Sequence, residues 1–557
     1  MSEEKLRQFE QKADELASRL VVLNDSPYLL HQVFLRIDYL IDNDMKREAG
    51  DLCSRISYLP RLLDNYIDES SQQIDLLQYS FDLENLLQYL HFCELMPQFH
   101  KDYYQVSGNE VDGFHLHHKQ ESFSKYEIQD VLMAELARPF CREKPGQLIQ
   151  PLLEIISKDP KLFKFPAHLM ENLIRFYQDN LYDLFEIPDS VYRRTIKCTA
   201  QEFMTIRNYL FALSEFQMNM LACAKIFRAL PADKYVEDTI ERSVFCFMPG
   251  HNLLDEARKY TGIGKNKILN SLRPFILDLT SSTAHKKNRN KHSGDGYFPP
   301  IVKVDDGYFL PPMAIKSFIC NRNLLFAFQK QDSHRFNSMI SKSFEPSLIT
   351  WIVRDLSILN GIEVRLNHVW SASSSSGEID ILIYSYKLNK VVIIQVKAVI
   401  PPQGARMVRN VQSRILEGIE QITRFRKILL SEKDRIISDS IGFQVSSLDF
   451  EDVILSSSCF GSAETWSELE SQNICGINHL LFKLLVFEAN QTKNADLLFD
   501  ISSWTKEKIA NLMHESNLRW EEREFELFGT KIHFPSWSID EKPLNTIRNQ
   551  ILEAKAA

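Results

Sequence analysis

One segment, SGEIDILIYSYKLNKVVIIQVKAVI from Ser376 to Ile400, constrains the fold of the chain more strongly than any other. Two runs rich in β-branched residues, Ile379 to Tyr386 and Val391 to Ile400, flank a polar break from Lys387 to Lys390. This pattern predicts a β-hairpin. The second run is apolar at almost every position, which is typical of a strand whose two faces are both covered.

Polar side chains interrupt the hairpin at matching heights. Because every second residue shares a strand face, Glu378 lies beside Asp380 on the first strand. For the same reason, Gln395 lies beside Lys397 on the second. A hairpin symmetric about Leu388-Asn389 places Asp380 opposite Lys397 and one diagonal step from Gln395, at ~7–8 Å, within reach of a bridging metal. The alternative is an edge strand whose Gln395 and Lys397 face water, because a buried lysine is costly unless it is paired or functional.

Asp380, followed after fourteen intervening residues by Gln395-Val396-Lys397, resembles the D…(E/Q)-x-K signature of the PD-(D/E)XK, or restriction endonuclease-like, nuclease superfamily. The glutamine form is similar to the branch typified by Mrr-type restriction endonucleases. The resemblance covers about Phe336 to Glu488. It implies an α/β domain with a central mixed sheet flanked by helices, whose core order is helix, strand, strand, helix, strand.

The segments around the hairpin fit this order. Ser343 to Gly361 predicts an amphipathic helix that carries Glu345, at the place where the superfamily commonly has an additional acidic ligand. Pro346 follows directly, so Glu345 is expected at a helix cap or beside a kink. A long helix is predicted downstream of the hairpin, and DFEDVILSSSCF, residues 449–460, is expected to be the next core strand. That long helix contains Gln421-x-x-x-Phe425, which is similar to a Q-x-x-x-Y element of some branches.

The resemblance implies a Mg²⁺- or Mn²⁺-dependent endonuclease that hydrolyses phosphodiester bonds in nucleic acid, with DNA favoured over RNA. Its metal ligands would be Asp380, the amide oxygen of Gln395, and Glu345. Lys397 would orient or deprotonate the attacking water and complete the catalytic set. Glu378 is a supporting partner or an alternative ligand, and Gln421 would contact the substrate or order the site.

The sequence around the predicted site is locally basic. Between Lys397 and Lys427 there are seven basic residues and two acidic ones, in a chain with a net charge of −9. Because the whole chain is acidic, contact with nucleic acid has to come from a local surface of this kind. The candidate substrate contacts are Arg406, Arg409 and Arg414. The alternative is a solvated helix face whose charges pair along the helix.

The region from residue 1 to 280 is expected to be all-helical, because apolar residues recur at helical spacing, as at Leu86, Leu87 and Leu90. A segment near residues 106–122 interrupts it and carries three histidines, at positions 115, 117 and 118. A metal site there would need histidine or carboxylate partners from elsewhere in the chain, so a surface loop or short strand is expected.

Residues 253–275 predict two helices separated by a tight turn at Thr261-Gly262-Ile263. As a helix-turn-helix, the second helix would offer Lys265, Lys267 and Arg273 to nucleic acid. The alternative is an αα-hairpin packed within a helical bundle.

The remaining boundaries follow from composition. Residues 281–330 are expected to hold a basic linker, Ser281 to Gly294, and a β-hairpin around Asp305-Asp306-Gly307. The nuclease-like domain is assigned to residues 331–490, and residues 491–557 to a C-terminal α+β extension.

Composition limits the cellular setting. No apolar stretch reaches the ~18 residues of a membrane span, and the N-terminus lacks a signal-peptide core. The nine cysteines include no C-x-x-C pair, which is typical of a reduced compartment without disulfides or structural zinc. We therefore expect a cytoplasmic protein that does not contact a membrane. No P-loop is present, so ATP hydrolysis through a Walker motif is not expected.

Three functions remain open from the sequence. By analogy, a nuclease domain joined to a large helical region suggests a restriction or phage-defence effector. The first alternative is a catalytically inactive, nuclease-like subunit that binds nucleic acid, because Gln395 is neutral where most superfamily members carry Glu. The second is a helical protein-interaction scaffold of a larger complex. A homodimer, or a partner protein bound through the N-terminal region, is compatible with each.

Overall fold

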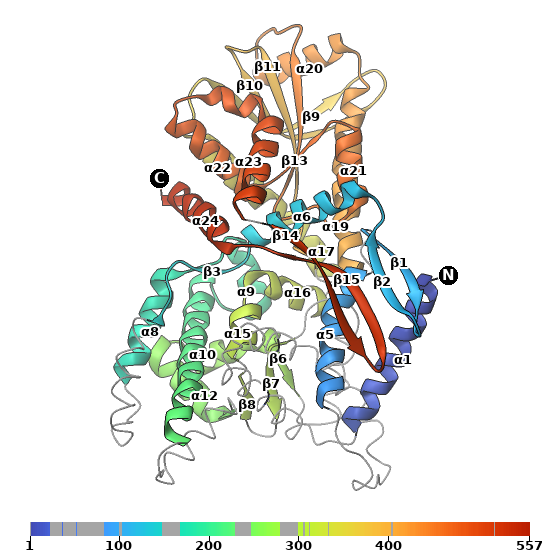
Figure 1. Ribbon diagram of the computed structural model, residues 1–557. Helices are drawn as coiled ribbons and strands as arrows, with labels where there is room; N and C mark the ends of the chain where they lie inside the picture. The colour runs from blue at the N-terminus through green and yellow to red at the C-terminus, as the bar shows by residue number, and fades with distance from the viewer. Residues whose placement is uncertain are drawn as a thin grey trace.

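The structure is a computed structural model that describes residues 2–22, 36, 52, 83–99, 103–146, 167–228, 247–278, 299–304, 307–310, 312–331, 333–402, 405–516 and 518–556. It has mixed α and β structure, with a five-stranded sheet and the helices that flank it at one end and a helix-rich part at the other (Figure 1). Among the described helices, none combines the length and apolar character that crossing a membrane requires.

The five-stranded sheet has the order β13-β12-β11-β10-β9. Its strands are β9 (Ile362–Ser371), β10 (Ser376–Ser385), β11 (Lys390–Lys397), β12 (Asp449–Ser456) and β13 (Cys475–Asn478). The first three pair antiparallel and the last three parallel, so the sheet is mixed and β11 is its central strand. The predicted hairpin is confirmed as β10 and β11, and the predicted strand that follows is confirmed as β12.

Helices cover both faces of this sheet, as the apolar pattern of β11 predicts. One face packs against α19 (Ala405–Arg426) and α20 (Leu430–Ile441) in a buried cluster that includes Leu382 and Ile393. The other face packs against α18 (Glu345–Leu356) and α22 (His479–Gln491). Three further elements, α21 (Ala463–Ser471), η5 (Ala495–Phe499) and α23 (Ile501–Glu515), complete this part of the fold.

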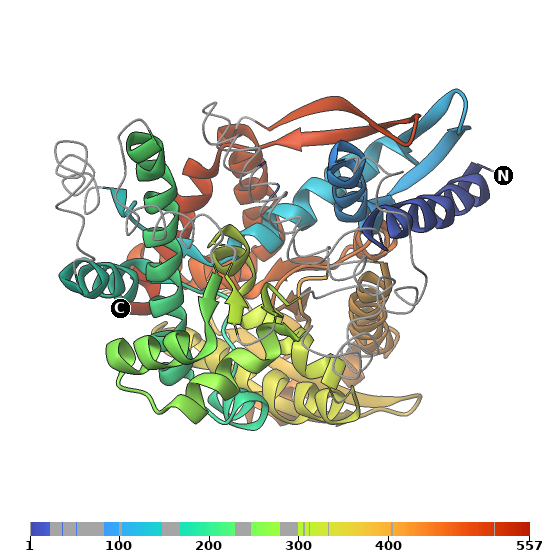
Figure 2. The ribbon, with the colours of Figure 1, turned by 90° about the horizontal axis from the view of Figure 1, so that it is seen from below.

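A second sheet, of order β1-β2-β15-β14, joins segments from opposite ends of the chain. It consists of β1 (Tyr104–Asn109), β2 (Gly113–His118), β14 (Arg519–Leu527) and β15 (Thr530–Ser538). Figure 2 shows β14 and β15 lying beside the N-terminal hairpin and helix α1 (Ser2–Val22). Helix α1 packs on β1, and α5 (Leu83–Phe99) packs on β14. The C-terminal segment, expected as an extension, therefore shares a sheet with the N-terminal region.

The N-terminal region is largely helical, but it is not all-helical. Its further helices are α6 (Glu121–Leu136), α8 (Ala167–Asn180), α9 (Asp189–Ile196) and α10 (Ala200–Arg228). The strands within it are β1, β2, β3 (Phe140–Cys141), β4 (Leu181–Tyr182), β5 (Phe247–Pro249) and β6 (Ile276–Asp278). The histidine-rich segment forms the β1–β2 hairpin, because Gly108 and Gly113 adopt positive φ at its turn and the buried Phe114 and Leu116 alternate with polar residues.

The predicted helical pair is confirmed as α12 (Gly250–Thr261) and α13 (Lys265–Leu272), followed by η3 (Arg273–Phe275). Gly262, with φ of 70°, ends α12 in the left-handed region. The predicted hairpin is confirmed as β7 (Ile301–Val304) and β8 (Gly307–Phe309), in a sheet of order β5-β8-β7-β6. Residues 281–294 and the turn residues 305 and 306 lie outside the described residues.

The chain after this hairpin forms α15 (Pro312–Phe318), α16 (Asn321–Gln331) and α17 (Ser333–Met339). A π-helical segment, η4 (Ile340–Phe344), leads directly into α18. The last element, α24 (Glu541–Ala556), packs on α6 and α22. Glu345 is therefore the first residue of α18 within a longer helical run, with Pro346 in the first turn of that helix.

Candidate functional site

The candidate site lies where the two central strands separate. The regular ladder between β10 and β11 ends at the pair Ile381–Ile394. Beyond this pair, side chains replace the backbone ladder: the Val396 amide donates to Asp380 Oδ2 at 2.7 Å, and Gln395 Nε2 donates to the Glu378 carbonyl at 2.7 Å. The predicted polar residues thus hold the open end of the hairpin together.

The register differs from the expected one. Asp380 contacts the backbone beside Gln395 and does not lie opposite Lys397 as predicted. The reason is the turn, which occupies residues 386–389 and is closed by the pair Ser385–Lys390. Asn389 adopts a φ of 51°, and the Ser385 hydroxyl accepts from the Leu388 amide, so the turn begins one residue earlier than the polar pattern indicates.

The neighbouring strand β9 is also irregular at this height. Its ladder with β10 pairs Ile379 with His368 and Ile381 with Leu366 but omits Asp380. Asn367, which faces that gap, has a φ of 47°, a conformation that L-residues adopt rarely. Asp380 therefore lies outside the regular ladder on both sides.

The negative charge of the Asp380 carboxyl is only partly offset by the groups around it. Burial raises its pKa to about 6, and the negative charges of Glu345 and Glu378 act in the same direction. The Val396 N–H and the Lys397 ammonium lower the pKa, but they do not offset the burial. The side chain of Glu378 is exposed, so that residue acts here through its charge and its backbone carbonyl.

Lys397 is buried, with 5% of its surface exposed, and its Nζ donates to Gln421 Oε1 at 2.9 Å. Helix α19 approaches closely because residue 418 is a glycine: a Cβ there would lie 2.9 Å from Lys397 Cε and 3.0 Å from Ile454 Cδ1. The sequence pattern alone does not predict this role for Gly418. Its signal is a lone glycine inside a strongly amphipathic helix, where glycine costs about 1 kcal/mol relative to alanine.

Glu345 reaches the same end of β11 from the opposite face of the sheet. Its Oε2 accepts from the Ala398 amide at 3.3 Å and lies 3.8 Å from Arg414 Nη1. A cavity borders this position and is lined by residues that include Ala398, Asn410 and Arg414. Asp380, Gln395, Lys397, Glu345 and Gln421 are thus brought to one place.

The orientation of Gln395 is fixed by its partner. The Glu378 carbonyl can only accept, so the Gln395 side chain must present its NH₂ group to that oxygen. The amide oxygen of Gln395 therefore points away from Glu378 and is available to another partner. A glutamate at this position would place a carboxylate against the carbonyl instead.

The basic residues of α19 differ in whether an acidic side chain pairs with them. Arg409 is exposed, whereas Arg424 pairs with Glu420 along the helix at 3.1 Å. Arg426 pairs with Asp452 and with backbone carbonyls, so it is structural. The side chain of Arg406 lies outside the described residues.

Phe425, the last residue of the Gln421-x-x-x-Phe425 element, belongs to the core. Its ring packs against Trp370 and Phe450, with centroid distances of 5.4 and 6.2 Å. It therefore anchors α19 to the sheet, whereas Gln421, one turn earlier, faces the site.

Two of the three cations predicted to contact nucleic acid are held in ion pairs, whereas the third, Arg273, is exposed in η3. Lys265 pairs with Asp255, and Lys267 Nζ lies 2.5 Å from Glu202 Oε1. Helix α13 packs on α9, α10 and η3. These contacts favour the packed αα-hairpin over a nucleic-acid-binding helix-turn-helix.

A separate cluster lies on the second sheet. Within the described part of the chain, one group of three histidine, cysteine or carboxylate side chains has ligand atoms that all lie within 4.8 Å of one another: His115, Glu522 and His533. It shares no residue with the site at β10 and β11.

Comparison of the chain with protein-family models and with curated proteins finds no match. A functional assignment therefore depends on the residues and their geometry.

Proposed function

We propose that the domain around β10 and β11 is a restriction endonuclease-like, metal-dependent nuclease that hydrolyses phosphodiester bonds in nucleic acid, with DNA as the favoured substrate. The observation that carries this proposal is the convergence of Asp380, Gln395 and Lys397 at the open end of the hairpin. Glu345 and Gln421 approach the same place from helices on opposite faces of the sheet.

The donor set fits a hard divalent cation. Asp380 and Glu345 supply carboxylate oxygens, and Gln395 supplies an amide oxygen, which are the ligands that Mg²⁺ and Mn²⁺ prefer. Asp380 uses Oδ2 for the Val396 amide, which leaves Oδ1 for a cation. Its raised pKa also indicates a carboxylate in need of positive charge. When bound, the metal would polarise the scissile phosphate and lower the pKa of a bound water.

The other roles belong to the chain itself. The Lys397 ammonium has three donors, of which one meets Gln421, so two can contact a phosphate oxygen or the attacking water. Gln421 is a positioning residue, because it fixes the ammonium rather than touching substrate. Arg409 and Arg414 lie on the same helix and supply positive charge for the nucleic-acid backbone.

A cleavage panel tests the proposal. Supercoiled plasmid, linear duplex, single-stranded DNA and RNA are incubated with Mg²⁺, Mn²⁺ or EDTA, using wild type, Asp380→Asn and Lys397→Ala. Lys427→Ala is the matched control, because Lys427 is an exposed lysine just beyond α19. We expect metal-dependent cutting that both site variants lose and the control retains. Equal cutting by wild type and Asp380→Asn would contradict the proposal.

A second candidate is a nuclease-like subunit that binds nucleic acid without cutting it. The observation in its favour is that Gln395 is neutral and already donates to the Glu378 carbonyl. Salt-sensitive binding by the wild type, without cleavage of any substrate in the panel, would favour this candidate over the nuclease.

A further inference from the structure

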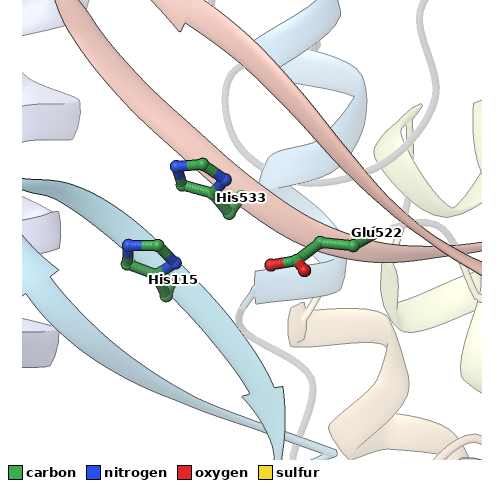
Figure 3. A group of neighbouring side chains, drawn as sticks. All are labelled: His115, Glu522 and His533. Carbon is green, nitrogen blue, oxygen red and sulfur yellow. The ribbon is translucent and has the colours of Figure 1, made fainter.

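Three adjacent strands of the β1-β2-β15-β14 sheet place a histidine, a second histidine and a glutamate side by side. His115 on β2 lies in register with His533 on the parallel strand β15. Glu522 on β14 lies opposite Pro535, two residues beyond His533 on β15. Figure 3 shows the two imidazoles and the carboxylate on the same side of the strands.

The two imidazole rings are stacked. Their centroids lie 4.2 Å apart with an interplanar angle of 4°, and the ligand atoms of His115, His533 and Glu522 all lie within 4.8 Å of one another. His115 and His533 are half-buried, whereas Glu522 is exposed. The site is thus held by backbone pairing across three strands and is open to solvent on one side.

Two members of this group have no competing partner. Within the described part of the chain, neither the His115 side chain nor the Glu522 side chain makes a hydrogen bond or ion pair. His533 Nδ1 lies 3.4 Å from Glu524 Oε2, and Glu524 is in turn held by Lys531 Nζ at 2.8 Å. Glu524 thus adds negative charge next to the histidines and supports one of the rings, as carboxylates do around metal-binding histidines.

We propose that His115, His533 and Glu522 form a binding site for a divalent transition metal of the zinc class. Imidazole nitrogen suits Zn²⁺, whereas Mg²⁺ prefers oxygen, so this site selects a different ion from the one proposed at Asp380. Two histidines and one glutamate leave a fourth position for water or another ligand, as in open zinc sites.

The fit requires only small side-chain movements. Zinc–ligand bonds of about 2.1 Å in a tetrahedral arrangement separate ligand atoms by roughly 3.4 Å. Since the ligand atoms lie within 4.8 Å of one another, a movement of at most about 1.4 Å closes each separation, and the exposed Glu522 side chain can supply much of it. No core residue has to move, because the buried Phe114, Ile532 and Phe534 alternate with these positions along β2 and β15.

An ion at this site would stabilise the junction between β2 and β15. The pairing of β2 with β15 is short, comprising Phe114–Ile532 and His115–His533. A metal bound to one histidine from each strand would clamp this junction between the N-terminal hairpin and the C-terminal strands. Binding to the folded state alone then stabilises it by mass action.

The neighbouring histidines have other environments. His117 is exposed, and its ring lies 6.2 Å from that of His115, outside the group of three. His118 Nε2 lies 3.0 Å from the buried Glu127. His117 is therefore the matched control: it is a histidine on the same strand and the same face.

The test is calorimetric titration of chelator-treated full-length protein with Zn²⁺ alone, together with thermal unfolding with and without Zn²⁺. We expect one saturable site per chain, an increase in Tm on binding, and at least tenfold weaker binding in His115→Gln, His533→Gln and Glu522→Gln. His117→Gln should bind like the wild type. Because Glu522 is exposed, its variant reports on the site without disturbing the fold.

Co²⁺ provides a second readout. Substitution by Co²⁺ should give the intense visible absorption of a tetrahedral or five-coordinate ion, and this absorption should be lost in His533→Gln. The absence of saturable Zn²⁺ binding by the wild type would overturn the proposal. Unchanged affinity in the three ligand variants would overturn it equally, because the zinc would then be bound elsewhere.

Discussion

The ammonium group of Lys397 donates a hydrogen bond of 2.9 Å to the amide oxygen of Gln421, which lies 24 positions further along the chain. The bond joins the central strand of the sheet to helix α19. It explains how a buried lysine is tolerated next to an apolar core, because its charge has a fixed polar partner. The bond also fixes the Lys397 ammonium near Asp380. The positive charge of Lys397 lowers the pKa of the Asp380 carboxyl.

Removing the partner of Lys397 should slow cleavage without abolishing it. Gln421→Ala is expected to lower kcat by roughly 10- to 160-fold, since a hydrogen bond to a charged group contributes about 1.5–3 kcal/mol and each 1.36 kcal/mol is tenfold in rate. Because Gln421 positions the lysine, KM should change less than kcat. The control is Gln412→Ala, a glutamine of the same helix that pairs with Glu464. An equal loss in both variants would indicate a general effect on the helix.

Gly418 should resist substitution although it lies inside a helix. Gly418→Ala gains about 1 kcal/mol of helix propensity, but its Cβ would meet Lys397 Cε and Ile454 Cδ1 at 2.9 and 3.0 Å. We expect a net loss of about 1–3 kcal/mol in the free energy of unfolding. Ser413→Ala, at an exposed position of the same helix, should be neutral or slightly stabilising. Urea unfolding of both variants checks the prediction.

Asp380 should make stability depend on pH. Its folded-state pKa of about 6 lies above the ordinary value of 3.8, so the folded state holds the proton more tightly. The resulting stabilisation is complete below about pH 4 and is lost as the pH rises through about 6. In EDTA, Asp380→Asn should therefore be more stable than wild type at pH 7.5, by up to about 2–3 kcal/mol, and nearly equal to it at pH 4. A pH-independent difference between the two proteins would contradict this assignment.

The same carboxyl predicts the pH dependence of activity. Metal binding requires the ionised form, so metal-dependent cleavage should rise through about pH 6 at subsaturating Mg²⁺. Saturating metal should shift this rise to lower pH, because the cation stabilises the carboxylate. Rates measured from pH 5 to 8 at two Mg²⁺ concentrations would show the shift.

Gln395→Glu should destabilise the metal-free protein at neutral pH. The carboxylate would face the Glu378 carbonyl, which now accepts from the glutamine NH₂ group at 2.7 Å. The expected loss is about 1–2 kcal/mol, towards the low end of the cost of an unsatisfied acceptor, because this bond is only partly buried. At pH 5 a protonated glutamate can donate to that carbonyl, so the loss should shrink. Urea unfolding in EDTA at both pH values measures the difference, and equal losses would contradict the explanation.

The sequence predicts the local elements of this fold well, and it predicts their register less well. The β10–β11 hairpin, the helix carrying Gln421 and the strand β12 follow from periodicity. The predicted register of the hairpin is wrong, because the register depends on the Ser385 hydroxyl and the positive φ of Asn389, which periodicity does not report. The sheet shared by β2 and β15 was not foreseen, because pairing between opposite ends of the chain leaves no local signal.

The candidate site shows the same division. The sequence predicts Asp380, Gln395, Lys397 and Gln421 as site residues, and the structure brings their side chains together. The main-chain groups that hold them, such as the Val396 amide, are common to all residues and leave no mark in a sequence. The histidine cluster was recognised only in part, since His533 and Glu522 lie far from His115 in the chain.

The most direct test of the nuclease assignment separates binding from cleavage in one variant. Asp380→Asn removes a negative charge from the site, so DNA binding in EDTA should equal or exceed that of the wild type. Cleavage in Mg²⁺ should fall by at least about 100-fold, because the carboxylate needed for the metal is gone. If Asp380→Asn cleaves DNA at the rate of the wild type, under conditions where the wild type requires Mg²⁺, the account is contradicted.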